Sequence, residues 1–412
     1  MTASAEAVRI ERIASGGDGV GRLPDGRTVF VPRSAPGDLV TLRDLALHKR
    51  FARARIDAIL EHAAERVVPS CPHYVRDNCG GCQLQHLALP AQEAAKRAIV
   101  GDALRRLGKF DVADPALESA PAAWHYRGRI TLHRAERGDR IGFHRLAQPG
   151  NVFELETCHI ADERLVELWR VLRRHRALLP ATFDGLTLRI ERGGARHVLL
   201  RAAGGDAWTR GRELAQRLAA DGQPATVWWQ PERGAARVVG GGTDLFPASV
   251  FEQVHPAMGD RLRIHALEQL GDVAGRRVWD LYAGIGEATA ALAEAGAVVE
   301  SVEWDRHAVQ VAEPRGPAGP RRLAARVEDA LDRLKPPELV LTNPPRTGME
   351  PRVVDTIAAH RPARLVYVSC DPATLARDLA RLGPPYRLAH VRAFDLFPQT
   401  AHVETVAVME RT

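Results

Sequence analysis

The sequence has few lysines, few cysteines and no long apolar run, and each shortage excludes a class of protein. No apolar stretch reaches the roughly 18 residues that a membrane-spanning helix needs, so no membrane partner is expected. The chain starts MTASAEAVRIERI, without the basic start and apolar run of a secretory signal. Its five cysteines are an odd number, and structural disulfides are uncommon in the cytosol. We therefore expect a cytoplasmic protein whose cysteines serve a metal site or catalysis.

Positive charge comes almost entirely from arginine. Only four of the 57 basic residues are lysines, namely Lys49, Lys96, Lys109 and Lys335, which leaves 53 arginines. The net charge of +6 permits a polyanionic partner such as a nucleic acid. The excess of arginine together with abundant alanine is also typical of a GC-rich genome. Charge alone therefore favours a nucleic-acid partner only weakly.

The cysteines divide into a group of four and a single one. Cys71, Cys79 and Cys82 stand close together in CPHYVRDNCGGC, and Cys158 follows after a long gap. This spacing is typical of a metal or iron–sulfur site, and both a four-thiolate zinc site and a four-iron cluster accept such ligands. The spacing leaves both alternatives open. Cys370 stands alone in VYVSCDPATL, where a strand is expected to turn into a helix.

The pattern of the 412 residues predicts three domains. Residues 1–58 hold short strands and glycine turns, which predict a small closed β-barrel of the oligonucleotide-binding type. Residues 59–243 mix strands and helices, and predict an α+β middle domain that carries the four cysteines. From residue 244 to residue 412 strands alternate with helices, which predicts an α/β domain with a mainly parallel, doubly covered sheet. The last two strands, YRLAHVRAF and HVETVAVME, are expected to form an antiparallel hairpin at the edge of that sheet.

The first strand of the α/β domain runs into a glycine loop, DLYAGIG, that suits a nucleotide-like cofactor. Gly284 and Gly286 let the backbone approach a ligand closely, and Glu303 ends the next strand, where an acid can bind both hydroxyls of a ribose. The third glycine of a dinucleotide fingerprint is missing, so a nucleoside without a pyrophosphate, such as S-adenosylmethionine, fits better. Asn343 in NPPR, at the end of a later strand, could hold a substrate or the cofactor's amine.

Two further residues could carry chemistry at the same end of the sheet. Cys370 ends a strand, and Asp371 and Pro372 predict the N-cap and first turn of the following helix. The helix dipole favours the thiolate of Cys370, whereas the charge of Asp371 opposes it, so the net effect is left open. Glu404 starts an otherwise apolar strand, where it is either a general base or a solvated charge at the strand end.

Taken together, these motifs resemble the RNA uracil-C5 methyltransferase family, in the branch with a TRAM domain and an iron–sulfur cluster. LFPASVFEQVHP, DLYAGIG, NPPRTG, VYVSCDPATLARDL and DLFPQTAHVETV occur in the family's order, and the resemblance covers nearly the whole chain. It implies a class I, Rossmann-like methyltransferase domain behind a TRAM-like barrel and an iron–sulfur-bearing middle domain. Asn343 stands where the family usually has an aspartate.

The resemblance also implies a mechanism and a set of roles. C5 of uracil is a poor nucleophile, and addition of a thiolate to C6 creates an enolate that can accept a methyl group. By resemblance, Cys370 is this nucleophile and Glu404 is the base that removes the C5 proton. The residues implied to hold S-adenosyl-L-methionine are Gln253, Tyr282, Gly284, Gly286, Glu303 and Asn343. The residues implied to hold a [4Fe-4S] cluster, with zinc as the alternative, are Cys71, Cys79, Cys82 and Cys158.

The resemblance favours 23S ribosomal RNA as the partner, because members with both TRAM and a cluster mostly act on it. A transfer-RNA uridine-C5 methyltransferase and a non-catalytic RNA-binding protein with a degenerate methyltransferase domain remain as alternatives. A cytosine-C5 methyltransferase should carry a second cysteine beside the proline motif, and NPPR has none. We expect the protein to act as a monomer.

Overall fold

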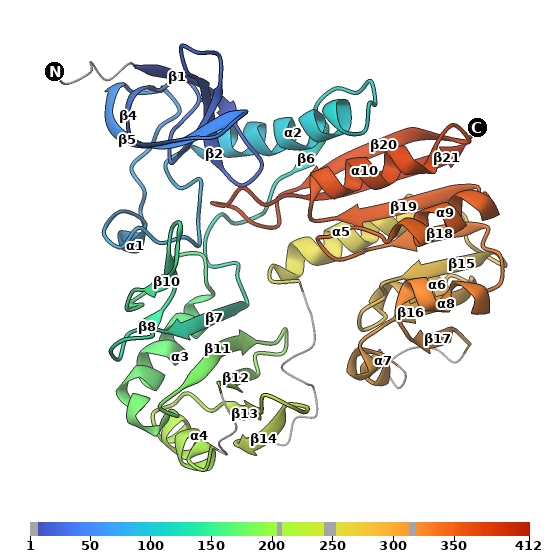
Figure 1. Ribbon diagram of the computed structural model, residues 1–412. Helices are drawn as coiled ribbons and strands as arrows, with labels where there is room; N and C mark the ends of the chain where they lie inside the picture. The colour runs from blue at the N-terminus through green and yellow to red at the C-terminus, as the bar shows by residue number, and fades with distance from the viewer. Residues whose placement is uncertain (1–6, 204–207, 243–252, 313–318) are drawn as a thin grey trace.

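The computed structural model describes residues 7–203, 208–242, 253–312 and 319–412, and begins with a closed β-barrel (Figure 1). Alternating side chains of its strands, such as Val29 and Val31, are buried inside it, as expected for a small barrel filled by side chains. The prediction of a small N-terminal barrel is confirmed. Its strands, in the order in which they pair, are β1 (Val8–Ile13), β2 (Asp18–Arg22), β3 (Thr28–Pro32), β5 (Phe51–Glu61) and β4 (Leu39–Leu47).

A connecting segment and a mixed middle unit follow the barrel. The segment holds α1 (Pro72–Val75) and α2 (Leu89–Arg106). The sheet of the middle unit has the order β14 (Arg237–Gly240), β13 (Thr226–Gln230), β12 (Arg196–Ala202), β11 (Phe183–Ile190), β7 (Arg129–Arg134) and β8 (Ile141–Gly142). The other elements of this unit are β9 (His144–Arg145), β10 (Gln148–Val152), α3 (Glu163–Arg174), a 3-10 turn (Arg176–Leu178) and α4 (Gly211–Ala220). The predicted boundary at residues 243–244 lies outside the described residues.

The C-terminal unit is built on a large sheet that is mainly parallel. Its order is β17 (Arg321–Ala324), β16 (Val298–Glu303), β15 (Arg277–Leu281), β18 (Leu339–Thr342), β19 (Arg364–Ser369), β21 (Glu404–Arg411), β20 (Tyr386–Phe394) and β6 (Ala116–Glu118). The five strands from β17 to β19 are parallel to one another, and β21 is antiparallel to both of its neighbours. This is the doubly wound arrangement that the sequence predicts.

Helices cover both faces of this sheet. Alternation along β15 sends Val278 into one core cluster and Trp279 into another, because neighbouring side chains of a strand point to opposite faces. The Trp279 cluster includes α2, α9 (Pro351–His360) and α10 (Pro372–Leu382), and the Val278 cluster includes α5 (Pro256–Glu268) and α6 (Glu287–Glu294). The remaining elements are α7 (Arg306–Ala312), α8 (Val327–Ala330) and a 3-10 turn (Leu331–Arg333).

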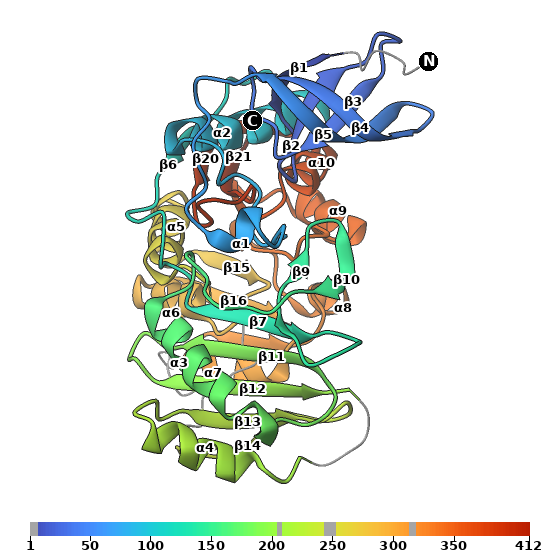
Figure 2. The same ribbon diagram turned by 90° about the vertical axis from the view of Figure 1, so that its left-hand side faces the viewer.

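The sheet differs from the prediction at its edge. β20 and β21 form the expected antiparallel hairpin, but the short strand β6 pairs in parallel outside β20. Three residues are too short a run to be recognised as a strand from sequence. Helix α2 lies between the barrel and the sheet and packs on α10 (Figures 1 and 2). Among the described residues, no helix is long and apolar enough to cross a membrane.

Candidate active site

The order of the strands brings the predicted site residues to one end of the sheet. Tyr282, Glu303, Asn343 and Cys370 directly follow or end β15, β16, β18 and β19, which are neighbours and parallel. Glu404 begins β21, and because this strand runs antiparallel, its start lies at the same end of the sheet. Ligands of open α/β sheets bind at this carboxyl end. The structure thus places a cofactor loop and two reactive side chains along one edge.

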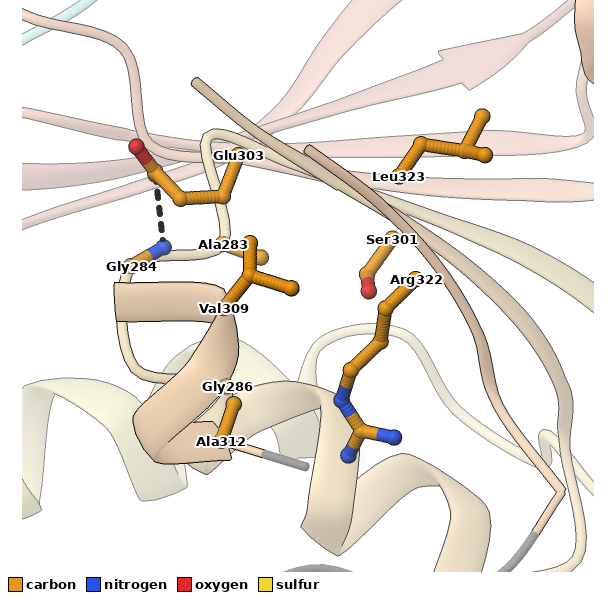
Figure 3. A pocket seen from close by; sticks show the side chains of 9 residues that line it. All are labelled: Ala283, Gly284, Gly286, Ser301, Glu303, Val309, Ala312, Arg322 and Leu323. Carbon is orange, nitrogen blue, oxygen red and sulfur yellow. Dashed lines mark hydrogen bonds between the residues drawn. The ribbon is translucent and has the colours of Figure 1, made fainter. Parts of the chain in front are cut away.

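The loop after β15 is shaped to take a ligand against its backbone. Tyr282, Gly284 and Gly286 all have left-handed backbone angles, with φ of 62°, 56° and 74°. A side chain at Gly286 would bring its Cβ within 3.1 Å of the Cβ of Ala312, whereas Gly284 faces open space. Figure 3 shows the loop and Glu303 lining one small pocket. The backbone of this loop is therefore accessible where a cofactor can lie.

Carboxylates surround this loop. Glu303 accepts a hydrogen bond from the backbone N–H of Gly284 at 2.9 Å through one oxygen and from that of Asp305 at 2.8 Å through the other. Each oxygen keeps a lone pair with which it can accept a hydroxyl proton. Asp280 is buried beneath the loop and accepts the hydroxyl of Thr289 at 2.5 Å, and burial raises its pKa to about 6. These residues fit a nucleoside such as that of S-adenosylmethionine.

The role of Glu303 leads to a first prediction, on cofactor affinity. Glu303→Ala should raise the Kd for S-adenosylmethionine by about 10- to 100-fold, because a hydrogen bond to a charged group is lost. Glu303→Gln keeps an oxygen that can accept the backbone N–H of Gly284, so its Kd for S-adenosylmethionine should rise less than that of Glu303→Ala. Isothermal titration calorimetry on both variants checks this. An unchanged Kd for Glu303→Ala would contradict the assignment.

The structure places the other two predicted cofactor residues differently. Gln253 lines a second small cavity, between the start of α5 and the middle sheet, together with Gly128 and Ile190. The pocket that contains Glu303 is a separate one. Asn343 is exposed directly after β18, and its backbone N–H bonds to the carbonyl of Leu281 on β15 at 3.2 Å. Asn343 therefore lies between the cofactor loop and Cys370, whereas Gln253 lines a cavity other than the one that Glu303 lines.

Cys370 lies opposite Glu404 at the ends of two paired strands. Ser369 pairs with Thr405 in the register of β19 and β21, and the next step of that register sets Cys370 against Glu404. Facing residues of an antiparallel pair have Cβ atoms about 4.5–5.5 Å apart. Asp371 caps α10 as predicted, and accepts the backbone N–H groups of residues 373 and 374 at 2.9 Å each. The charge of Glu404 acts on the pKa of the Cys370 thiol, so the two groups lie close enough to interact.

Burial and charge shift the pKa values of both groups upward. Burial raises the pKa of the Cys370 thiol above its ordinary value, Glu404 raises it further, and Arg346 lowers it. Burial also raises the pKa of Glu404, which is 4% exposed, to about 7, and Arg346 again opposes the shift. The net effect on Cys370, which the sequence left open, is therefore toward the neutral thiol.

Arg346 is the residue of this site that sequence reasoning did not single out. It belongs to the NPPR motif, but the motif alone does not indicate that its guanidinium lies near Cys370 and Glu404, which belong to other parts of the sheet. Its positive charge favours the thiolate of Cys370 and the carboxylate of Glu404. Its position could have indicated a role in the site, because it follows a strand that ends at the same edge of the sheet as the strand before Cys370.

The two raised pKa values predict different pH profiles for steps that use each group. A step that needs the carboxylate of Glu404 should accelerate between about pH 6 and pH 8, with a midpoint near its pKa of about 7. A step that needs the thiolate of Cys370 should keep accelerating through the alkaline range, because the thiol pKa is raised. Single-turnover rates measured between pH 5.5 and pH 9.5 check this. A common midpoint for both steps would contradict it.

The four other cysteines gather in a different part of the molecule. Cys71, Cys82 and Cys158 share one buried cluster with aromatic side chains. Burial, together with the nearby Cys158 and Cys71, raises the pKa of the Cys79 thiol to about 12. The described residues contain no group of three or more His, Cys, Asp or Glu side chains that is arranged to hold a metal ion. The thiols are thus brought together as predicted, but in no ligating arrangement, and the cluster stays a prediction.

Comparison with known families gives two matches along the chain. Residues 321–412 match the family described as tRNA (Uracil-5-)-methyltransferase. Residues 4–56 match the TRAM domain. The first range contains Asn343, Arg346, Cys370 and Glu404, and the second covers most of the barrel.

Curated relatives match the chain over nearly its full length. An uncharacterized RNA methyltransferase of Thermosynechococcus vestitus is 31% identical over 98% of this chain and 97% of its own. The 23S rRNA (uracil(1939)-C(5))-methyltransferase of Azoarcus sp. is 32% identical, over 98% of this chain and 99% of its own. The enzyme of the same description from Chromohalobacter salexigens is 33% identical, over 99% of this chain and 90% of its own.

A solved structure shows the same fold from end to end. The tRNA (uracil-54, C5)-methyltransferase of Pyrococcus abyssi, in complex with S-adenosyl-L-homocysteine, superposes with a TM-score of 0.71. It covers 99% of this chain and 100% of its own, at 22% sequence identity. At that identity the likeness establishes the arrangement of the three units, and no more.

Proposed function

Since the chain belongs to the RNA uracil-C5 methyltransferase family, we propose that it methylates C5 of a uridine in RNA, through a covalent adduct of Cys370. The observation that carries the covalent mechanism is the pairing of a thiol and a carboxyl group next to a cofactor loop. Cys370 directly follows β19 and Glu404 begins β21, the strand that pairs with β19, while the NPPR loop follows β18 on the other side of β19.

In the proposed reaction, Cys370 gives up its proton to water, and its sulfur then adds to C6 of the uracil ring. The electron pair of the C5–C6 double bond then makes C5 nucleophilic. S-adenosylmethionine, when bound, supplies the methyl group to C5. Glu404 then removes the C5 proton, the C5–H electron pair restores the double bond, and the sulfur leaves as a thiolate. The raised pKa of Glu404, about 7, suits a base that works near neutral pH.

Arg346 has a supporting role in this proposal. Its charge makes both ionised forms easier to reach inside a site whose burial disfavours them. The cofactor is assigned to Gly284, Gly286 and Glu303, which line the pocket of Figure 3, and to Tyr282 of the same loop. Asn343 is proposed to contact the cofactor or the base from its exposed position between the two. Gln253 is proposed as a further cofactor contact on the strength of the resemblance alone.

We favour 23S ribosomal RNA as the substrate, because relatives of 32% and 33% identity are described as acting on it. The barrel, which matches TRAM, is proposed to bind the RNA. The test is incubation of the protein with labelled S-adenosylmethionine and either 23S ribosomal RNA or transfer RNA, followed by nucleoside analysis. We expect 5-methyluridine in the ribosomal RNA. 5-Methyluridine in transfer RNA alone would show that transfer RNA is the substrate. Its absence from both RNAs would contradict the proposed function.

We further propose that Cys71, Cys79, Cys82 and Cys158 hold a [4Fe-4S] cluster. The support is the donor set: four thiols from two distant stretches of chain lie close enough to act on one another's pKa values. Four thiolates also suit tetrahedral zinc, which remains the competing occupant. No step of the proposed reaction uses this group, so we propose for it a structural or an RNA-facing role.

Metal analysis should separate the two occupants. Protein purified without oxygen is expected to contain iron and sulfide in equal amounts, and Cys79→Ser should lose most of both. Cys370→Ser is the matched control, since it removes a thiol outside the group and should keep its iron. Stoichiometric zinc without iron would show that the four cysteines hold zinc and not an iron–sulfur cluster.

A further inference from the structure

The loop that leads to Glu404 is held from outside by a distant part of the chain. Residues 395–403 connect β20 to β21, and Phe394 and Glu404 are the last paired residues before and after the loop. Gln399, in the middle of the loop, has a left-handed backbone with φ of 70°, which is uncommon for a residue other than glycine. A loop of this kind keeps one conformation only when its surroundings fix it.

Lys96 of α2 makes the first of these outside contacts. Its side chain is 0% exposed, and its Nζ lies 2.5 Å from Oδ1 of Asp395 and 3.0 Å from the carbonyl oxygen of Phe397. The same Asp395 oxygen accepts the backbone N–H of Phe397 at 3.2 Å. A fully buried ion pair adds little stability over an apolar pair, but its geometry is demanding. Lys96 thus fixes the start of the loop.

Gln92, one helical turn earlier, fixes the middle of the loop. Its Oε1 accepts the backbone N–H of Gln399 at 2.9 Å, and its Nε2 donates to the side-chain oxygen of Gln399 at 3.0 Å. Its Nε2 also donates to the carbonyl of Leu87 at 2.8 Å, which orients the amide. Both glutamines are buried. The strained residue of the loop is therefore bonded through its backbone and its side chain at once.

The peptide that follows Cys82 completes the support. The backbone N–H of Leu84 donates to the carbonyl of Gln399 at 3.0 Å. The side chain of Gln83 donates to the carbonyl of Gly80 at 2.9 Å and accepts the N–H of Ala401 at 3.4 Å. One stretch of chain, residues 83–96, therefore contacts the loop at its start, middle and end.

We propose that Gln92 and Lys96 are positioning residues, which hold loop 395–403 so that Glu404 can reach the C5 proton of the methylated uridine. This inference rests on the proposed function of Glu404 as the base. The alternative is that both residues serve the stability of the fold only.

The two possibilities differ in which step of the reaction slows. Attack of Cys370 on C6 and methyl transfer come before Glu404 acts. In the last step Glu404 takes the C5 proton, the C5–H electron pair forms the C5–C6 double bond, and the Cys370–C6 bond breaks with its pair on sulfur. A displaced Glu404 slows this last step alone, so that methylated adduct accumulates on ordinary RNA.

The experiment compares wild type with Gln92→Met, a variant of similar side-chain length that loses the three hydrogen bonds. RNA made with 5-fluorouridine reports adduct formation, because fluorine at C5 cannot leave as a proton. Ordinary RNA reports release of the adduct. We expect trapping on fluorinated RNA at a rate within about 2-fold of wild type, and release from ordinary RNA slowed by about 10- to 100-fold, as for a misplacement of about 1 Å.

Two further variants keep the outcome decisive. Lys96→Met/Asp395→Leu replaces the ion pair without leaving a buried charge alone, and should show the same selective loss if Gln92→Met does not fold. Leu104→Ala, about two turns beyond Lys96 and buried in the core of α2, is the matched control. It should lower the melting temperature and leave the ratio of the two rates unchanged.

Other results would overturn the inference. Equal slowing of trapping and release in Gln92→Met would show a structural role only, and unchanged release would show no role. Absence of trapping by the wild-type protein would instead overturn the proposed function, and the inference with it. The wild-type reaction therefore tells the two failures apart.

Discussion

Cys370→Ala is expected to abolish methyl transfer to RNA and leave the binding of S-adenosylmethionine unchanged. Without the sulfur no bond to C6 forms, and C5 stays too weak a nucleophile to be methylated. The loss should be on the order of 10⁴-fold or more, as for other enzymes that lose their nucleophile. The methylation rate and the cofactor Kd are measured on the same preparation. Cys370 lies outside the pocket of Glu303, so the Kd should not move.

A second cysteine variant serves as the control for this result. Cys370→Ser keeps the size of the side chain and should be as inactive as the alanine variant, because the hydroxyl of serine is a far weaker nucleophile than a thiolate. Retention of more than about a tenth of the wild-type rate by either variant would exclude covalent catalysis by Cys370, since loss of a nucleophile costs far more than that.

Glu404→Gln is expected to separate adduct formation from release. The neutral amide cannot take the C5 proton, so turnover should fall by about 10²- to 10⁴-fold, the usual contribution of a general base. Adduct formation should persist, and a complex stable to denaturation should appear with ordinary RNA. Burial disfavours the charged form of Glu404, so the glutamine variant should fold at least as well.

The control for this prediction is the pH profile. The rate at which the wild-type protein releases the RNA adduct should fall below about pH 7, the pKa of Glu404. The slow residual release by Glu404→Gln should not depend on pH in this range. A glutamine variant that turned over at the wild-type rate, with no adduct on ordinary RNA, would show that another group removes the proton.

Much of the fold could be predicted because its signals are local. Strand–glycine–helix patterns around Gly284 and Gly286 placed the cofactor loop, and the proline after Asp371 placed the start of α10, as observed. Short strands around glycine turns predicted the barrel. Strand β6 was not predicted, because three residues are too few to show a periodic pattern and its partner β20 lies far along the chain.

The contacts that position the site could not be predicted, because they join residues that are far apart in sequence. Lys96 is one of four lysines, and a lysine on a helix is normally exposed, yet this one is buried against Asp395. Only tertiary packing decides that outcome. The convergence of the four cysteines could be expected from their number and spacing, but in the described residues they are not arranged to hold a metal ion.

The most direct test of covalent catalysis by Cys370 is to identify the residue that forms a bond to the RNA. The protein would be incubated with S-adenosylmethionine and 23S ribosomal RNA made with 5-fluorouridine, then digested with trypsin and ribonuclease and analysed by mass spectrometry. We expect the peptide LVYVSCDPATLAR, residues 365–377, to carry one methylated 5-fluorouridine on Cys370. An unmodified peptide, in a preparation that methylates ordinary RNA, would contradict the covalent mechanism.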